Sequence, residues 1–207
     1  MVDRRLLLDG GAPVLPHLAR LGIDPGGIDA LFLTHFHGDH LLGLPPFFLY
    51  RVFEAERPLE VVGPAGVEER LETLNQLAWG NDWAEFRPRL GVTYREAVGP
   101  GQVAGVEYEP VRLDHGRRGC TGYRLRIGDR LLAYAGDSEP TPPLDRLVEG
   151  ADLAIVEATG PGQVPTHTSW EEAARLRERH PKTRFYFNHV YAGEPEGAAR
   201  DLQVIEI

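Results

Sequence analysis

The residues best suited to chemistry lie in one short run, Thr34-His35-Phe36-His37-Gly38-Asp39-His40. It gathers three imidazoles and a carboxylate, which are ligands that zinc, manganese and iron accept. His35 and His37 can point the same way in an extended chain, because alternate side chains share a face. The glycine that follows lets the chain turn, so that Asp39 and His40 aim at a second point. The spacing therefore favours a loop that feeds two adjacent metals over a helical H-E-x-x-H motif that holds one.

The sequence on either side of this run indicates an α/β protein. Residues 28–34 are typical of a buried strand, and the segment from Leu41 onward is typical of an apolar helix. Further polar groups follow other predicted strands, namely His115, Asp137 and His189, and His167 stands just before a predicted helix. Polar groups at the carboxyl ends of strands are typical of an α/β active site.

Hydrophobic patterning predicts the elements that must position these groups. The expected strands are 4–9, 30–34, 59–62, 92–98, 103–113, 122–127, 130–135, 153–157 and 184–189. The expected helices are 13–21, 44–53, 66–79, 142–149 and 169–179. Gly128-Asp129 is a predicted hairpin turn. Thr168 or Ser169 suits a helix N-cap, because acidic residues follow in the first turn.

Composition narrows the class of protein. The 207 residues are enough for one substantial core, so we expect a single domain over 1–207. No apolar run reaches membrane-spanning length and the first residues do not resemble a secretion signal, so we expect a cytoplasmic protein. A net charge of −9 disfavours a large basic surface for nucleic acid. Cys120 is the single cysteine, which excludes an intramolecular disulfide and a cysteine-based zinc site.

Taken together, these residues resemble the metallo-β-lactamase-fold hydrolases. The residues that carry the resemblance, in the family's order, are His35-Phe36-His37-Gly38-Asp39-His40, His115, Gly136-Asp137-Ser138 and His189. Leu7-Leu8-Asp9-Gly10-Gly11 is similar to the strand and glycine turn that precede the family's motif. The resemblance implies a four-layer αββα sandwich. The family usually has a further strand or hairpin before Leu6, so we expect a trimmed sheet edge or a mis-assigned start, and a second subunit could cover such an edge.

The resemblance also implies a ligand set for two metals. One metal would take His35, His37 and His115, the second would take Asp39, His40 and His189, and Asp137 would bridge both. A hydroxide between the metals would be the nucleophile. Two zinc ions are expected, with manganese or iron as alternatives, because zinc lowers the pKa of bound water to about 7.

Two segments are similar to the branch of ribonuclease Z and related phosphodiesterases. Residues 151–159 resemble the branch's HEAT segment, with Val156 in place of the histidine, and His167-Thr168-Ser169 resembles its His-Ser-Thr motif. The resemblance implies that His167 stabilises or protonates the departing ester, so His167 and Asp39 are the catalytic candidates. Ribonuclease Z inserts a tRNA-gripping arm between the residues that match His115 and Asp137. Only 21 residues separate the two here, so we expect a small, anionic substrate rather than long nucleic acid.

Several readings stay open at this level. Asp9 is either a partner of a ligand histidine or a turn former, and Glu157 either orients His167 or ends a strand. Arg117 and Arg118 either clamp an anionic substrate or are solvated. The loop 160–165 could form an edge of the site. An acyl hydrolase of the same fold, acting on a thioester, lactone or β-lactam, is the main alternative, and a non-enzymatic metal-binding protein or a tRNA nuclease ranks lower.

Overall fold

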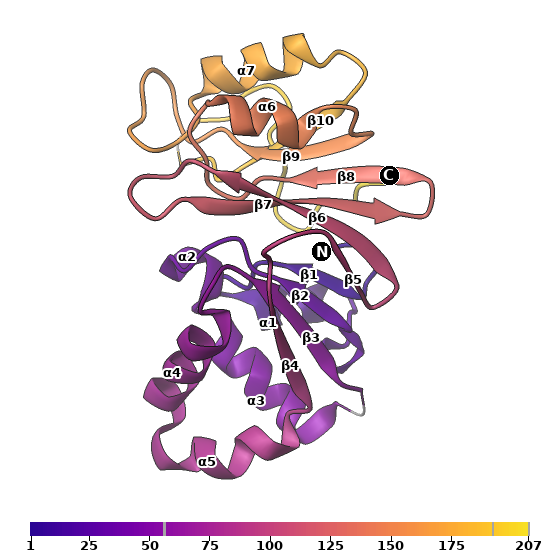
Figure 1. Cartoon of the computed structure of the whole chain (residues 1–207), viewed down its shortest axis with the longest axis vertical. Coiled ribbons are helices and arrows are strands. Elements are labelled where there is room, and N and C mark those ends of the chain that lie inside the picture. The colour runs from indigo at the N-terminus through magenta and orange to yellow at the C-terminus, as the bar shows by residue number, and fades with distance from the viewer. Residues whose placement is uncertain (56, 192, 207) are drawn as a thin grey trace. The chain divides into compact units, whose positions relative to one another are not determined.

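The structure is a computed structural model that describes residues 1–55, 57–191 and 193–206. The chain divides into two compact units, Met1–Val98 and Gly99–Ile207. Each unit contains its own β-sheet, its own helices and its own hydrophobic core (Figure 1). The prediction of a mixed α/β fold with two sheets is therefore confirmed.

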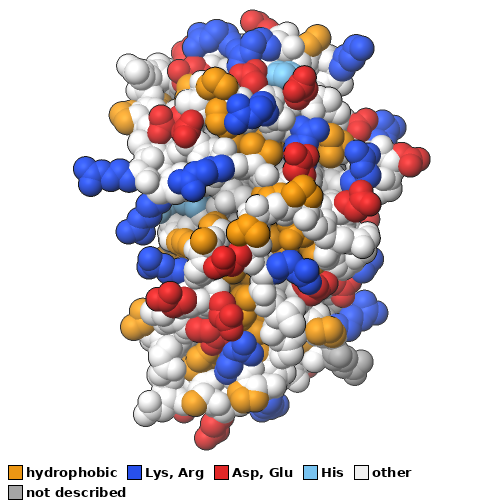
Figure 2. All heavy atoms as spheres, in the orientation of Figure 1, with side chains coloured by type: hydrophobic (Ala, Val, Ile, Leu, Met, Phe, Trp, Pro, Cys, Tyr) orange, Lys and Arg blue, Asp and Glu red, His pale blue; other side chains and the backbone are white. Residues whose placement is uncertain are grey.

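The surface drawn in Figure 2 carries charges of both signs, with arginine and acidic side chains interspersed rather than gathered by sign. This pattern fits a chain with 22 basic and 31 acidic residues. In the part of the chain that the structure describes, none of the helices has both the length and the apolar character needed to cross a membrane.

The first unit is built on a four-stranded sheet in the order β1-β2-β3-β4, with every neighbouring pair parallel. Its strands are β1 (Leu6–Leu8), β2 (Ala30–Phe32), β3 (Leu59–Gly63) and β4 (Val92–Glu96). Its α-helices are α1 (Val14–Arg20), α2 (Gly38–Leu41), α3 (Leu44–Glu54), α4 (Val67–Trp79) and α5 (Trp83–Phe86). Short 3-10 turns cover Pro25–Gly27, Gly80–Asp82 and Arg87–Arg89.

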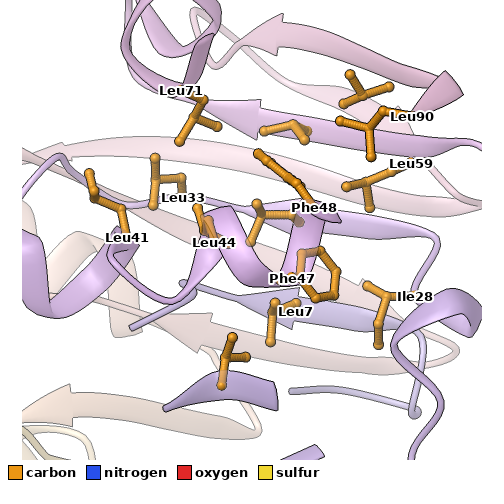
Figure 3. Packing of buried hydrophobic residues seen from close by; sticks show 14 of the residues in the cluster. Leu7, Ile28, Leu33, Leu41, Leu44, Phe47, Phe48, Leu59, Leu71 and Leu90 are labelled. Carbon is orange, nitrogen blue, oxygen red and sulfur yellow. The ribbon is translucent and has the colours of Figure 1, made fainter. Parts of the chain in front are cut away.

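Helix α3 supplies much of the first unit's core. Leu44, Phe47 and Phe48 are fully buried and pack in one cluster with Leu33, just after β2, and Leu59 of β3 (Figure 3). Burying one such side chain contributes about 1.5–3 kcal/mol. The inward face of this helix therefore serves core packing. Because the helix starts just after the histidine-rich run, its packing also fixes where that run ends.

The second unit is built on a six-stranded sheet in the order β10-β9-β8-β7-β6-β5. Its strands are β5 (Gly101–Val103), β6 (Val106–Leu113), β7 (Cys120–Ile127), β8 (Arg130–Tyr134), β9 (Leu153–Glu157) and β10 (Arg184–Asn188). Strands β8, β9 and β10 are parallel, whereas β5 to β8 are antiparallel. The predicted hairpin at Gly128-Asp129 joins β7 to β8, and the positive φ of 58° at Gly128 is what a type II′ turn requires at that position.

Helices α6 (Pro142–Val148) and α7 (Trp170–Arg179) cover one face of this second sheet (Figure 1). Leu147 and Leu176 are buried in the core beneath them. Ser169 is the N-cap of α7 and forms a capping box with Glu172, which confirms the predicted cap. The cap fixes the backbone just after His167, so it also helps to position the His167 side chain.

The structure departs from the predicted elements in three places. The predicted strand 103–113 is two strands, because the chain reverses at Ala104 and Gly105, which both have positive φ. Asp39 and His40 lie within the one-turn helix α2, not on a loop as expected. The helix α5 was not predicted, because four residues are too short for a periodic pattern to emerge.

Candidate metal centre

In the first unit, the chain leaves β2 and runs directly into the histidine-rich segment. The His35 ring centroid lies 4.6 Å from that of His37 and 4.2 Å from that of His40. His35 and His40 are buried, whereas His37 and Asp39 are exposed. Helix α2 brings Asp39 to the cluster, with its Oδ2 at 3.5 Å from His40 Nε2. The four residues predicted from this run are therefore gathered in one place.

The buried carboxylate of Asp9 organises this cluster. Asp9 Oδ2 lies 2.8 Å from His40 Nδ1, and Asp9 Oδ1 accepts a 2.8 Å hydrogen bond from the backbone N–H of Thr34. The Thr34 hydroxyl donates to the same carboxylate at 2.9 Å. A carboxylate accepts a hydrogen bond from a ring nitrogen that carries a proton. Asp9 therefore fixes the proton of His40 on Nδ1, which leaves the free lone pair of the ring on Nε2. The expectation that Asp9 partners a ligand histidine agrees with this geometry.

Two glycines allow the turn after Asp9 to touch helix α2. A Cβ on Gly11 would lie 1.9 Å from the backbone oxygen of Asp39, and one on Gly43 would lie 2.5 Å from the oxygen of Gly11. The backbone N–H of Gly10 donates to the His40 oxygen at 2.7 Å. The close approach therefore requires glycine, and it holds the segment that carries Asp9 against the segment that carries His40.

The second unit gathers further donors around Asp137, which follows β8. The ligand atoms of Asp137, Glu157, His167 and His189 all lie within 4.8 Å of one another. Asp137 Oδ2 is 3.5 Å from His189 Nε2 and 3.8 Å from His115 Nε2. Strands β6, β8, β9 and β10 all end at this cluster, as the positions of the polar residues after each strand predicted.

Glu157 is fully buried and holds several segments together. Its carboxylate accepts hydrogen bonds from the backbone N–H groups of Ser138 and Thr168 and from the Thr159 hydroxyl. Its Oε2 lies 2.8 Å from His167 Nδ1. Burial acts to raise the pKa of Glu157, but the hydrogen bonds from His167, His189, Thr159 and Ser138 outweigh burial and lower it.

The same contact acts on His167 in the opposite sense. The hydrogen bond to Glu157 raises the pKa of His167, although burial partly opposes the shift. The His167 ring stacks on His189, with centroids 5.2 Å apart and planes 19° apart. His115 Nδ1 is 2.8 Å from the backbone oxygen of Thr166, which directs the lone pair of that histidine to Nε2. One short segment before α7 therefore positions two histidines.

Other residues singled out in the sequence lie outside these clusters. Arg117 and Arg118 are exposed on the turn between β6 and β7. Cys120 is buried and its thiol donates to the backbone oxygen of Ala135 at 3.4 Å, which suits a core residue better than a nucleophile. The loop 160–165 has no helix or strand, as predicted.

The sequence did not predict that three threonines support these carboxylates, although Thr34 and Thr168 stand within the motifs. Thr34 contacts Asp9, and Thr159 and Thr168 contact Glu157. Their positions next to the motif residues were the only available signal, because threonine is common at strand ends and in turns.

The donors in each unit are of a kind that suits divalent metals. They are imidazoles and carboxylates without a thiolate, which fits zinc, manganese and iron. Several of the histidines have one ring nitrogen held by a carboxylate or a carbonyl, an arrangement typical of metal-binding histidines. The chemistry of these donors therefore suits a divalent metal.

This chain belongs to the β-lactamase superfamily, whose domain pattern matches residues 4–190. It is 30% identical to a ribonuclease Z from Mycobacterium sp. (strain KMS) over 84% of this chain and 69% of the relative. It is 26% identical to a ribonuclease BN from Erwinia tasmaniensis over 89% of this chain and 78% of the relative.

Solved structures show the same fold. The short form of human tRNase Z superposes with a TM-score of 0.79 at 21% identity, covering 100% of this chain and 90% of the other. A diphosphatase of the PhnP family gives a TM-score of 0.68 at 23% identity, covering 92% and 71%. The predicted metallo-β-lactamase fold is confirmed. The chain is a ribonuclease Z-like hydrolase of a superfamily that binds divalent metals.

Proposed function

We propose that this chain is a dinuclear metal-dependent phosphodiesterase that acts on a small or flexible phosphodiester. The observation that carries the proposal is the pairing of His167 with the buried Glu157 beside Asp137 and His189. A histidine held in this way is suited to give a proton to a departing alkoxide, which needs one at neutral pH. A thioester hydrolase has less need of such a residue, because a thiolate leaving group departs without a proton.

The proposed ligand set is the one that the family resemblance implies. His35, His37 and His115 would hold one metal, Asp39, His40 and His189 would hold the other, and Asp137 would serve both. Zinc is the expected ion, with manganese or iron as alternatives. When bound, the metals supply Lewis acidity and activate water at neutral pH. The contacts of His40 with Asp9 and of His115 with Thr166 support these assignments, because each directs Nε2 as the ligand atom.

The chain's own residues have separate roles in the reaction. Asp39, which is half-exposed, is the proposed acceptor for the proton of the attacking water. His167 donates the proton from Nε2 to the leaving oxygen, since its Nδ1 is held by Glu157. Glu157 does not touch substrate in this scheme, so it is a positioning residue that keeps His167 oriented and protonated.

The chain between His115 and Asp137 supports a small substrate over a folded RNA. Strands β7 and β8, the turns before each of them, and Ala135-Gly136 occupy all 21 residues of this interval, so no arm is inserted there. The alignment with the Erwinia tasmaniensis relative spans 242 positions, more than the 207 residues of this chain, so that relative carries insertions that this chain lacks. The interspersed charges in Figure 2 form no basic track on the face drawn.

The test is a comparison of ester classes with the zinc- or manganese-loaded protein. We expect turnover of bis(p-nitrophenyl) phosphate to exceed that of a lactone and a thioester. The variant His167→Ala is expected to lose about 10²–10⁴-fold in turnover of a phosphodiester with an alkoxide leaving group, the usual contribution of a general acid, and much less with bis(p-nitrophenyl) phosphate, because p-nitrophenolate departs without a proton. His180→Ala is the matched control, because His180 contacts Asp145 rather than the cluster. Wild-type protein that hydrolyses the lactone but not the phosphodiester would remove the proposal.

A further inference from the structure

Four aromatic rings form a continuous row in the second unit, and the last of them is exposed. The ring of His115 contacts His167 with centroids 4.9 Å apart, and His167 stacks on His189. Tyr191 contacts His189 edge to face, with centroids 4.8 Å apart and planes 75° apart. Its side chain is 72% exposed, so most of one aromatic ring is open to solvent beside the proposed ligand histidine.

Backbone contacts hold the chain at and before Tyr191, which distinguishes it from a loose surface residue. The Tyr191 N–H donates to the Thr159 oxygen at 3.0 Å. His189 has a positive φ of 54°, which turns the chain back after β10. Gly193 packs on the Trp170 ring so closely that a Cβ there would lie 2.4 Å from it. The exposed ring therefore stands on an ordered support.

We propose that Tyr191 is a specificity-determining residue that stacks on a planar group of the substrate next to the scissile phosphodiester, as a nucleobase would provide. The inference rests on the proposed phosphodiesterase function. An exposed aromatic face offers stacking worth about 1–3 kcal/mol per base. An exposed aromatic ring does not stabilise the hydrophobic core, whereas a planar group of the substrate could stack on it and cover it. The edge-to-face contact with the His189 ring keeps the Tyr191 ring beside the cluster.

The experiment compares two phosphodiesters that share one leaving group. Thymidine 5′-p-nitrophenyl phosphate carries a base, and methyl p-nitrophenyl phosphate does not. We expect Tyr191→Ala to lower the ratio of kcat/KM between the two substrates about 10-fold, mainly through the KM of the nucleotide ester. Tyr191→Phe retains the ring and is expected to retain the ratio. Phe53→Ala removes another exposed aromatic side chain, at the far end of α3, and is the matched control.

The outcomes separate this inference from the proposed function. If wild-type protein hydrolyses both esters and Tyr191→Ala leaves the ratio as it was, the inference is wrong and the phosphodiesterase assignment stands. If wild-type protein hydrolyses neither, the proposed function fails and the inference fails with it. Competitive inhibition by thymidine 5′-monophosphate provides a second readout. Its Ki is expected to rise about 10-fold in Tyr191→Ala, and an unchanged Ki would contradict the inference.

Discussion

His167 Nδ1 lies 2.8 Å from Glu157 Oε2, and this contact joins a segment that precedes a helix to the end of a buried strand. The two residues are ten apart in the sequence. Each shifts the pKa of the other, and the two shifts have opposite directions. The contact lowers the pKa of Glu157 and raises the pKa of His167. The pair is therefore suited to hold a proton on the imidazole and negative charge on the carboxylate.

The first prediction concerns the pH profile of Glu157→Gln. The amide keeps the shape of the side chain but removes the charge that raises the pKa of His167. A general acid loses activity as pH rises through its pKa, so the alkaline limb of kcat is expected to move to lower pH. Steady-state kinetics of a phosphodiester across pH, beside His180→Ala as control, measure this. A profile that merely scales down, with both limbs in place, would indicate a structural role only.

The second prediction concerns metal affinity in Asp9→Asn. The carboxylate holds His40 through Nδ1, and the amide can present its NH₂ to that nitrogen and move the imidazole proton to Nε2. Loss of such a contact typically costs 10–100-fold in metal affinity, so we expect about that decrease. Competition with a chromophoric zinc chelator gives the affinity. Asp82→Asn, an exposed substitution in the same unit, is the control, and equal affinities in both variants would refute the assignment.

The third prediction concerns the stability of the first unit. Arg51 is buried, and its guanidinium donates to the backbone oxygens of Pro25 and Ile28 at 2.8 Å each, and also to Gly26 and Arg57. Arg51→Met leaves these carbonyls without their hydrogen-bond donor, and each buried acceptor left unpaired costs about 1–3 kcal/mol. We therefore expect the free energy of unfolding to fall by about 3 kcal/mol. Urea denaturation measures the change. Arg20→Met, on the exposed side of α1, should differ from wild type by less than about 0.5 kcal/mol; similar midpoints for both variants would contradict the prediction.

The fourth prediction concerns acid stability of the second unit. Asp145 on α6 binds Arg179 through both oxygens, at 2.9 and 2.8 Å, and His180 at 3.1 Å. The hydrogen bond from Arg179 lowers the pKa of Asp145. Burial acts in the opposite direction, and the hydrogen bond from His180 lowers the pKa further. A depressed pKa stabilises the fold above the ordinary value of 3.8, and this stability is lost as pH falls through the folded-state pKa.

The carboxylate of Asp145 is about one-third exposed, so solvent screens the pair. We therefore expect Asp145→Asn to lower the free energy of unfolding by only about 0.5–1 kcal/mol at pH 7. Denaturation at pH 7 and at pH 3 measures the difference between the two proteins. It should shrink at the lower pH, and a difference that stays constant would show that the charge is not its source.

Local patterns predicted those parts of the fold and site that depend on neighbouring residues. Strand β9 was predicted with its observed ends, because a run of four apolar residues followed by Glu157 stands between turn signals. The cap at Ser169 followed from the acidic residues after it. Ala104 was missed as a turn because alanine rarely adopts a positive φ.

Contacts between distant segments were beyond such patterns. Thr166 contacts His115 through its backbone oxygen, and a pattern of side chains in the sequence cannot reveal such a contact. The buried role of Arg51 also depends on carbonyls more than twenty residues away. By contrast, the partnership of Glu157 with His167 was foreseeable, because the resemblance placed both in known segments.

The central claim is that two metal ions bound by this chain drive phosphodiester hydrolysis. Its most direct test is to titrate metal-free protein with zinc while following bis(p-nitrophenyl) phosphate turnover and bound metal together. The account predicts that turnover rises to a plateau at two zinc ions per chain, and that Asp137→Asn lowers both the plateau and the bound metal. A plateau at one ion, or two bound ions without phosphodiester turnover, would contradict it.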